Sequence, residues 1–148
     1  MRHGHAPTPA EAGVKTDAQR PLSEKGRADA ARMAEEIVRR GGRPALVLHS
    51  PLVRAVQTAQ AAAAVLKTDA RAFDPLDNTL PPEEALSQLR LRVGDAADAL
   101  AVGHQPQIGE IAALLTDEIF EIRPAGIVAV EFSPEPRLLW SANVDELG

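Results

Sequence analysis

The first residues of the chain carry side chains that can do chemistry. Two histidines, His3 and His5, are separated by Gly4 and preceded by Arg2. A guanidinium is a rigid fork of hydrogen-bond donors suited to phosphate, and an imidazole can act as a nucleophile or a proton carrier near neutral pH. The stretch therefore has the components of a site that binds and attacks a phosphoryl group.

Two further candidates follow predicted strands. The run PALVLHS over 44–50 is typical of a buried parallel strand, and DALAVGH over 98–104 has the same form. Arg54 comes shortly after the first run, and His104 closes the second. Ligands bind outside the carboxyl ends of parallel strands, so we expect both residues to join the N-terminal arginine and histidine in one pocket.

The elements that must position these residues alternate between helices and strands. Ser23 is a candidate N-cap for a helix that ends at Gly41-Gly42, and the polar residues over 5–22 predict a long loop. The other expected elements are a helix from Arg54 to Leu66, a strand over 71–76, helices over 81–91 and 108–115, and a hairpin of 126–132 with 137–143. This order predicts a three-layer α/β/α sandwich with a mostly parallel central sheet and helices on both faces.

Composition limits the classes of function. The 148 residues fit one domain over 1–148, and the net charge of −5 without basic residues interleaved with aromatics argues against a nucleic-acid partner. The chain has no cysteine, which excludes a disulfide framework and a thiol nucleophile. No apolar run approaches the roughly 20 residues that cross a bilayer, so we expect no membrane association and a cytoplasmic location.

An ordered set of segments resembles the histidine phosphatase superfamily, and within it the SixA-type phosphohistidine phosphatase family. The superfamily's hallmark is the Arg-His-Gly triplet seen here at 2–4. The matching segments are MRHGHA (1–6), DAQRPLSEKG (17–26), HSPLVRAVQTA (49–59), VGHQPQIGEI (102–111) and PAGIVAVEF (124–132). The resemblance spans nearly the whole chain and implies a phosphoglycerate mutase-like fold.

The resemblance also implies a role for each central residue. His3 would be the nucleophile that becomes a transient phosphohistidine. Arg2 and Arg54 would hold the phosphoryl oxygens, and His104 would be a further hydrogen-bond donor to the phosphate. Arginines can replace the metal that other phosphoryl-transfer enzymes use, so neither a metal nor a cofactor is implied. His3 must stay neutral, which requires a partner for its other nitrogen, and the arginines should lower its pKa.

Weaker candidates surround this set. Gly4 would let the backbone approach the phosphate, and Arg20, which matches the family's Arg-Pro-Leu segment, would either line the rim of the pocket or tie down the long loop. Many superfamily members that cleave phosphate esters use a carboxylate as the general acid. Glu84 or Glu83 would supply one, although acidic residues in a first helical turn also compensate the helix dipole. His5 is another candidate proton donor.

The residues leave several functions open. The leading hypothesis is hydrolysis of phosphohistidine on a protein partner, such as a phosphotransfer domain of a signalling relay. The alternative within the enzyme class is a phosphatase for small phosphate esters or other phosphoproteins. Two alternatives are not enzymes. One is a metal site formed by His3, His5, His49 and His104, and the other is an inactive module that binds phosphate without turnover.

The beginning of the chain departs from the family pattern. Relatives carry an apolar central strand before the Arg-His-Gly triplet, whereas only Met1 precedes it here. Without that strand, buried backbone groups would lack partners and the core would contain a gap. We therefore expect the natural start to lie before Met1, which the mass of the native protein would reveal.

Overall fold

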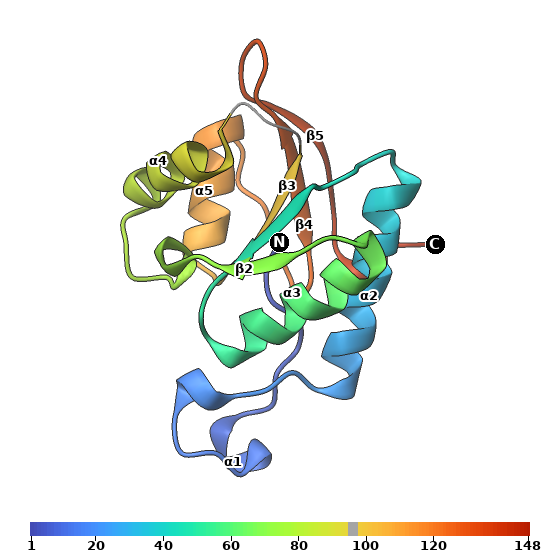
Figure 1. Ribbon diagram of the computed structural model, residues 1–148, viewed down its shortest axis with the longest axis vertical. Coiled ribbons are helices and arrows are strands. Elements are labelled where there is room, and N and C mark those ends of the chain that lie inside the picture. The colour runs from blue at the N-terminus through green and yellow to red at the C-terminus, as the bar shows by residue number, and fades with distance from the viewer. Residues whose placement is uncertain (95–97) are drawn as a thin grey trace.

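The structure is a computed structural model that describes residues 1–94 and 98–148 (Figure 1). Its parallel sheet has the strand order β2-β1-β3, and these strands are Ala70–Ala72, Leu46–His49 and Ala99–Val102. Strands β4 (Ile127–Glu131) and β5 (Arg137–Ala142) pair in antiparallel fashion. The strands predicted over 44–50 and 98–104 and the C-terminal hairpin are thus confirmed.

The N-terminal residues lie between the two sheets. Arg2 forms a parallel bridge with Gly103, and the His3 N–H donates to the Gly103 carbonyl at 3.0 Å. On the other side, the Arg2 N–H donates to the Gly126 carbonyl at 3.0 Å, and the Ala125 N–H donates to the Arg2 carbonyl at 3.1 Å. These bonds fix the backbone of His3 from two directions.

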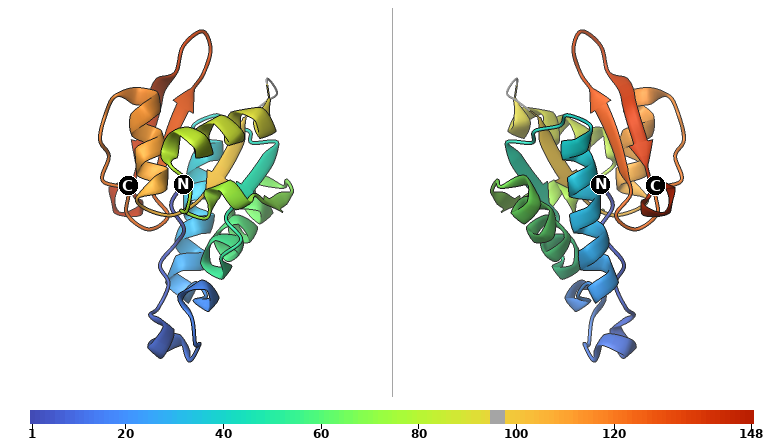
Figure 2. Two further views of the ribbon diagram at one scale, coloured as in Figure 1. Left: turned by 90° about the vertical axis from the view of Figure 1, so that its left-hand side faces the viewer. Right: turned by 90° about the vertical axis from the view of Figure 1, so that its right-hand side faces the viewer.

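Helices cover both faces of the parallel sheet (Figures 1 and 2). Helices α2 (Glu24–Arg39) and α3 (Val53–Leu66) pack against each other on one face, and α4 (Pro82–Val93) and α5 (Gln107–Thr116) pair on the other. The predicted α/β class is therefore confirmed. Within the described residues, no helix is both long and apolar enough to cross a membrane.

Strand β1 contributes to two separate cores. Val47 and Leu48 are both fully buried, and successive side chains of a strand point to opposite faces. Val47 packs in the core that contains Met33 of α2, whereas Leu48 packs in a second core with Leu76 and Ile108. The continuous apolar run that predicted this strand reflects burial on both faces.

The predicted loop over 5–22 contains more structure than expected. A one-turn helix, α1 (Pro9–Ala12), is followed by a 3-10 turn, η1 (Asp17–Gln19). The cause is a capping box, in which the Thr8 hydroxyl accepts from the Glu11 N–H at 3.2 Å and the Glu11 carboxylate accepts from the Thr8 N–H at 3.0 Å. The capping pattern of Thr8 and Glu11 is visible in the sequence, so this helical turn is predictable from local residues alone.

The strand predicted over 71–76 is also shorter than expected. Strand β2 ends at Ala72, and a 3-10 turn, η2 (Asp74–Leu76), takes the rest of the segment. Pro75 has no N–H to donate to a neighbouring strand, so the segment turns instead. The last 3-10 turn, η3 (Val144–Glu146), follows β5.

Candidate active site

His3 presents an unprotonated nitrogen to the site. Its Nδ1–H donates to the Gly4 carbonyl at 2.7 Å, which leaves Nε2 unprotonated in the neutral ring. The expected partner of the other nitrogen is therefore the carbonyl of the next residue. Arg54 Nε donates to this Nε2 in a long hydrogen bond, with 3.4 Å between the two nitrogens. Nε2 is thus the atom of His3 that can attack phosphorus.

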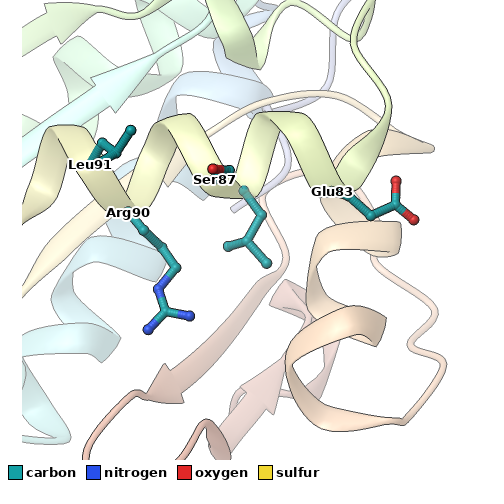
Figure 3. Close-up of a pocket in the computed structure, with 5 residues that line it drawn as sticks. Glu83, Ser87, Arg90 and Leu91 are labelled. Carbon is teal, nitrogen blue, oxygen red and sulfur yellow. The ribbon is translucent and has the colours of Figure 1, made fainter.

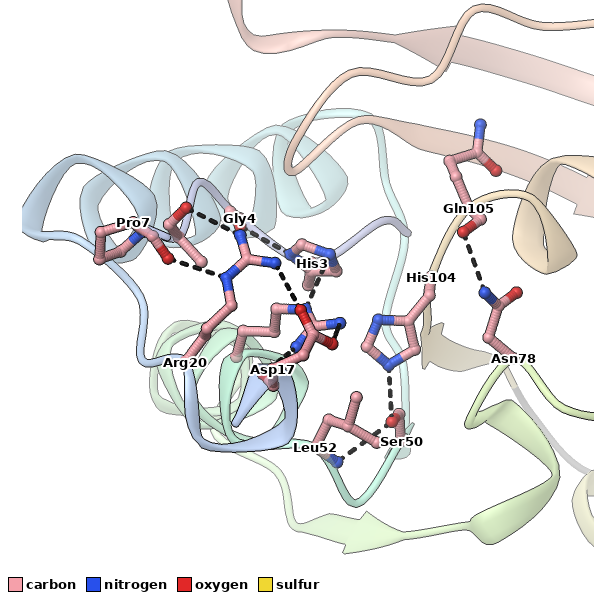
Figure 4. Close-up of polar contacts among 12 residues, drawn as sticks. His3, Gly4, Pro7, Asp17, Arg20, Ser50, Leu52, Asn78, His104 and Gln105 are labelled. Atoms are coloured by element: carbon pink, nitrogen blue, oxygen red, sulfur yellow. Dashed lines mark hydrogen bonds and ion pairs between the residues drawn. The ribbon is translucent and has the colours of Figure 1, made fainter. Parts of the chain in front are cut away.

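His104 faces His3 from the end of strand β3. Because β1 and β3 pair with His49 opposite Val102, the residues that follow each strand emerge at the same edge of the sheet. The two imidazole rings have centroids 5.1 Å apart, and His104 Nε2 lies 2.7 Å from the Ser50 hydroxyl oxygen (Figure 4). His104 is only 3% exposed, and its Nδ1 is buried without a hydrogen-bond partner among the described residues.

The two arginines bring positive charge to this pair of histidines. Arg54, in the first turn of α3, is 7% exposed and donates to the Asp17 carbonyl at 2.9 Å and to its carboxylate at 3.0 Å. Arg2 donates to the Ile122 carbonyl at 3.0 Å, while its Nε is buried and has no partner in the described part of the chain. The structure therefore brings together the four residues predicted from the sequence.

Burial holds both histidines in their neutral form. It lowers the pKa of His3 to about 4, against a smaller opposing effect of its bond to Gly4, and the charges of His104, Arg54 and Arg2 lower it further. Burial also lowers the pKa of His104 to about 4, and Arg54 and Arg2 add to this while Asp17 and Asp77 oppose it. The arginines thus act in the expected direction, but loss of solvent is the larger cause.

These pKa shifts predict an acid-sensitive fold. In the unfolded chain both histidines bind protons near pH 6.5, whereas in the folded chain they do so only near pH 4. The free energy of unfolding should therefore be highest above pH 6.5 and should fall as the pH drops from 6.5 towards 4.

Urea denaturation at successive pH values would measure this loss. The double variant His3→Ala/His104→Ala lacks both groups, so its free energy of unfolding should fall less steeply across the same window. Equal slopes for the wild type and the double variant would contradict the assignment.

Arg20 ties down the loop that precedes α2. Its Nε–H donates to the Pro7 carbonyl at 2.8 Å, and its Nη2 donates to the Ala6 carbonyl at 3.1 Å. Its Nη1 donates to the Asp17 carboxylate at 2.9 Å, which links it indirectly to Arg54 (Figure 4). Of the two interpretations of Arg20, the contacts match the one in which it holds the loop.

Gly4 is needed for a close backbone crossing. A Cβ on Gly4 would lie 2.7 Å from the Gly26 carbonyl oxygen, and a Cβ on Gly26 would lie 2.3 Å from the His5 carbonyl oxygen. The Gly4 N–H donates to the Thr58 hydroxyl at 2.9 Å. Tight packing against the first turn of α2 therefore accounts for the glycine, a reason different from the expected approach to phosphate.

The candidate proton donors do not contact His3 in the described part of the chain. His5 is exposed, and its Nδ1 lies 2.8 Å from the Ser23 hydroxyl. Glu84 is exposed in the first turn of α4 and forms no hydrogen bond or ion pair with the described residues. Glu83 borders a shallow depression along α4 that shares no residue with the His3 site (Figure 3).

The metal hypothesis required all four histidines to converge. His5 instead contacts Ser23, and His49 donates from Nδ1 to the Ser50 carbonyl at 2.8 Å. Over residues 1–94 and 98–148, no cluster of three or more histidine, cysteine or acidic side chains has the geometry to hold a metal ion. Only His3 and His104 of the proposed ligands therefore face each other.

Three residues near the site were not singled out from the sequence. Asp17 binds Arg54, Ser50 contacts His104, and the Thr58 hydroxyl accepts from the Gly4 N–H. Ser50 has a sequence signal, because it directly follows a strand whose carboxyl end was expected to face the ligand. The contacts of Asp17 and Thr58 join distant segments and leave no local pattern.

The family of the chain follows from its match to a family model. The model of the histidine phosphatase superfamily (branch 1) matches residues 1–78, which include Arg2, His3 and Arg54. The chain belongs to this superfamily and is a phosphatase. None of the curated proteins is significantly similar to it in sequence.

Solved structures show a more specific likeness to SixA. The protein histidine phosphatase SixA, crystallised with tungstate, superposes with a TM-score of 0.85 at 22% identity, covering 98% of this chain and 95% of that one. The proposed phosphohistidine phosphatase SixA of Agrobacterium tumefaciens gives 0.82 at 25% identity, with coverages of 97% and 94%. A mycobacterial glucosyl-3-phosphoglycerate phosphatase is less similar, with a TM-score of 0.66 at 19% identity and coverages of 96% and 97%. The fold is thus that of SixA.

Proposed function

We propose that the protein hydrolyses phosphohistidine on a protein partner, such as a phosphotransfer domain, through a covalent phosphohistidine on His3. The observation that carries the proposal is a pair of buried nitrogens, Arg2 Nε and His104 Nδ1, that have no hydrogen-bond partner among the described residues. Both side chains act on His3, whose Nε2 is unprotonated. Buried donors left unpaired are costly, so they favour a ligand that brings acceptors. A phosphoryl group brings three oxygens.

The reaction proceeds in two displacements. In the first, the lone pair of His3 Nε2 forms a bond to phosphorus while the phosphorus–nitrogen bond of the substrate breaks, and the released imidazole nitrogen takes up a proton from solvent. In the second, water attacks the phosphorus, the bond to Nε2 breaks, its electron pair returns to Nε2, and phosphate leaves. Arg2, Arg54 and His104 stabilise the charge on the phosphoryl oxygens in both steps, with no metal required.

The carboxylate that contacts Arg54 supports a phosphoramidate substrate. Asp17 binds Arg54, and its ion pair with Arg20, followed by the charge of Arg54, lowers its pKa, so it is ionised at neutral pH. An ionised carboxylate cannot donate the proton that an alkoxide leaving group needs. An imidazole is a better leaving group and depends less on a general acid.

Substrate selectivity tests this proposal. The value of kcat/KM for a histidine-phosphorylated phosphotransfer domain should exceed that for a phosphoserine peptide on the order of 10²-fold, because general acid catalysis contributes about that much or more to ester cleavage. Both activities should survive EDTA and be inhibited by tungstate, the oxyanion bound in the SixA structure.

Two results would contradict the proposal. Equal or faster cleavage of the phosphoserine peptide would favour the broader phosphatase, and loss of activity in EDTA would overturn the metal-independent mechanism.

A further inference from the structure

The hydroxyl of Ser50 is buried between two elements of the site. Ser50 directly follows β1, is fully buried, and its Oγ lies 2.7 Å from His104 Nε2. The same Oγ accepts from the Leu52 N–H at 3.2 Å (Figure 4). A backbone N–H can only donate, so this contact uses the oxygen as an acceptor and leaves its hydrogen available for another partner.

Two arrangements of the hydrogens are chemically possible. If Ser50 donates to His104 Nε2, the neutral imidazole carries its proton on Nδ1, and of these groups only the Nδ1–H lacks a partner among the described residues. If Nε2 donates to Ser50 instead, both the serine hydrogen and the Nδ1 lone pair are left buried without partners in the described residues. Each unmade bond of a buried polar group carries a penalty, so the first arrangement is favoured.

We propose that Ser50 is a positioning residue that fixes the tautomer of His104, so that Nδ1 carries the proton and donates it in a hydrogen bond to the phosphoryl oxygens. This inference rests on the proposed phosphatase site and adds a residue to it. Figure 4 shows Nδ1 on the side of the ring that faces His3, opposite the nitrogen that contacts Ser50. In the other tautomer, a lone pair of Nδ1 would face the phosphoryl oxygens and repel them.

The tautomer of His104 decides which nitrogen can donate a hydrogen bond, because the ring is neutral. A protonated imidazole has donors on both nitrogens, whereas a neutral one has a single donor whose place is set by the partner of the other nitrogen. Burial lowers the pKa of His104 to about 4, so the ring is neutral at the pH of most assays. Loss of a donor at a site of developing charge typically lowers kcat by 10²- to 10³-fold.

The variant Ser50→Ala tests the proposal with three readouts, which are the tautomer of His104, kcat and the affinity for tungstate. In protein labelled with ¹⁵N-histidine, long-range ¹H–¹⁵N spectra of the wild type should show a protonated Nδ1 and an unprotonated Nε2 for His104. In Ser50→Ala the Nε2–H tautomer should predominate, and kcat should fall roughly 10- to 100-fold because only a small part of the population remains competent. Tungstate should bind the variant about tenfold more weakly.

Two further variants complete the test. Ser50→Thr keeps a hydroxyl and should retain the wild-type tautomer and most of the kcat. Thr116→Ala, which removes a hydroxyl bound to the Ala112 carbonyl in α5, should change none of the three readouts. A protonated Nε2 in the wild type, or a loss of activity in Ser50→Ala with the tautomer unchanged, would overturn the proposal.

The tautomer and the tungstate affinity do not depend on the substrate. If the wild type has the Nδ1–H tautomer and loses it in Ser50→Ala but does not cleave phosphohistidine, the assignment of Ser50 stands and the proposed substrate fails. If phosphohistidine is cleaved but the wild type lacks the Nδ1–H tautomer, the proposed substrate stands and the assignment of Ser50 fails.

Discussion

His3→Ala should reduce turnover on the order of 10⁴-fold or more. His3 Nε2 is the atom proposed to form the bond to phosphorus, and removing a nucleophile leaves only the binding and electrostatic contributions of the site. Mixing the enzyme with ³²P-labelled phosphohistidine protein and quenching in alkali should trap a labelled phosphoenzyme in the wild type. His3→Ala should show neither label nor turnover, because the water that would replace the imidazole is not positioned for attack.

His5→Ala is the matched control for this prediction. It removes an exposed imidazole two residues away, which contacts Ser23 and not His3. Its turnover should stay within about threefold of the wild type, since surface substitutions away from the chemistry have small effects. Turnover by His3→Ala at more than a few per cent of the wild-type rate would contradict the covalent mechanism.

Gly26→Ala should destabilise the fold by about 3 kcal/mol or more. In the interior of a helix, replacing glycine by alanine normally stabilises by about 1 kcal/mol. Here the new Cβ would lie 2.3 Å from the His5 carbonyl oxygen and 3.0 Å from its nitrogen, so a backbone segment must move. A fall in the free energy of unfolding would therefore indicate the clash at the close crossing, whereas a rise would indicate that the intrinsic helix preference dominates.

Urea denaturation measures directly whether Gly26→Ala lowers or raises the free energy of unfolding. Arg27→Ala is the control, because Arg27 is exposed in the same turn of α2 and its substitution should change the free energy of unfolding by no more than about 0.5 kcal/mol. The displaced segment carries His3, so turnover by the folded fraction of Gly26→Ala should fall as well. A Gly26→Ala protein as stable as the wild type would show that the crossing relaxes freely.

The grouping of the four central residues could be predicted from the sequence. Arg54 and His104 each follow an apolar strand, and parallel strands in one sheet share the edge at which their carboxyl ends lie. Helix α2 could also be predicted, because Ser23 caps it as expected and its Oγ accepts from the Gly26 N–H at 3.0 Å. These features depend on local pattern and on one rule of topology.

Other parts of the site depend on contacts that leave no local trace. Asp17 meets Arg54 across 37 residues of sequence, so no spacing in the chain indicates the pair. The close crossing of Gly4 and Gly26 arises only when the N-terminal segment docks on α2. The sequence shows that each of the two positions is glycine, but the neighbour that requires it is known only from the folded chain.

The position of β1 between two cores has a consequence for how the domain unfolds. Val47 packs with the helices on one face and Leu48 with those on the other, and the same strand leads directly into Ser50. Melting of either helical layer would expose one side of β1 and release the residues that follow it. The two layers should therefore lose structure together in one cooperative transition, and an oxyanion bound at the strand ends would protect both of them equally.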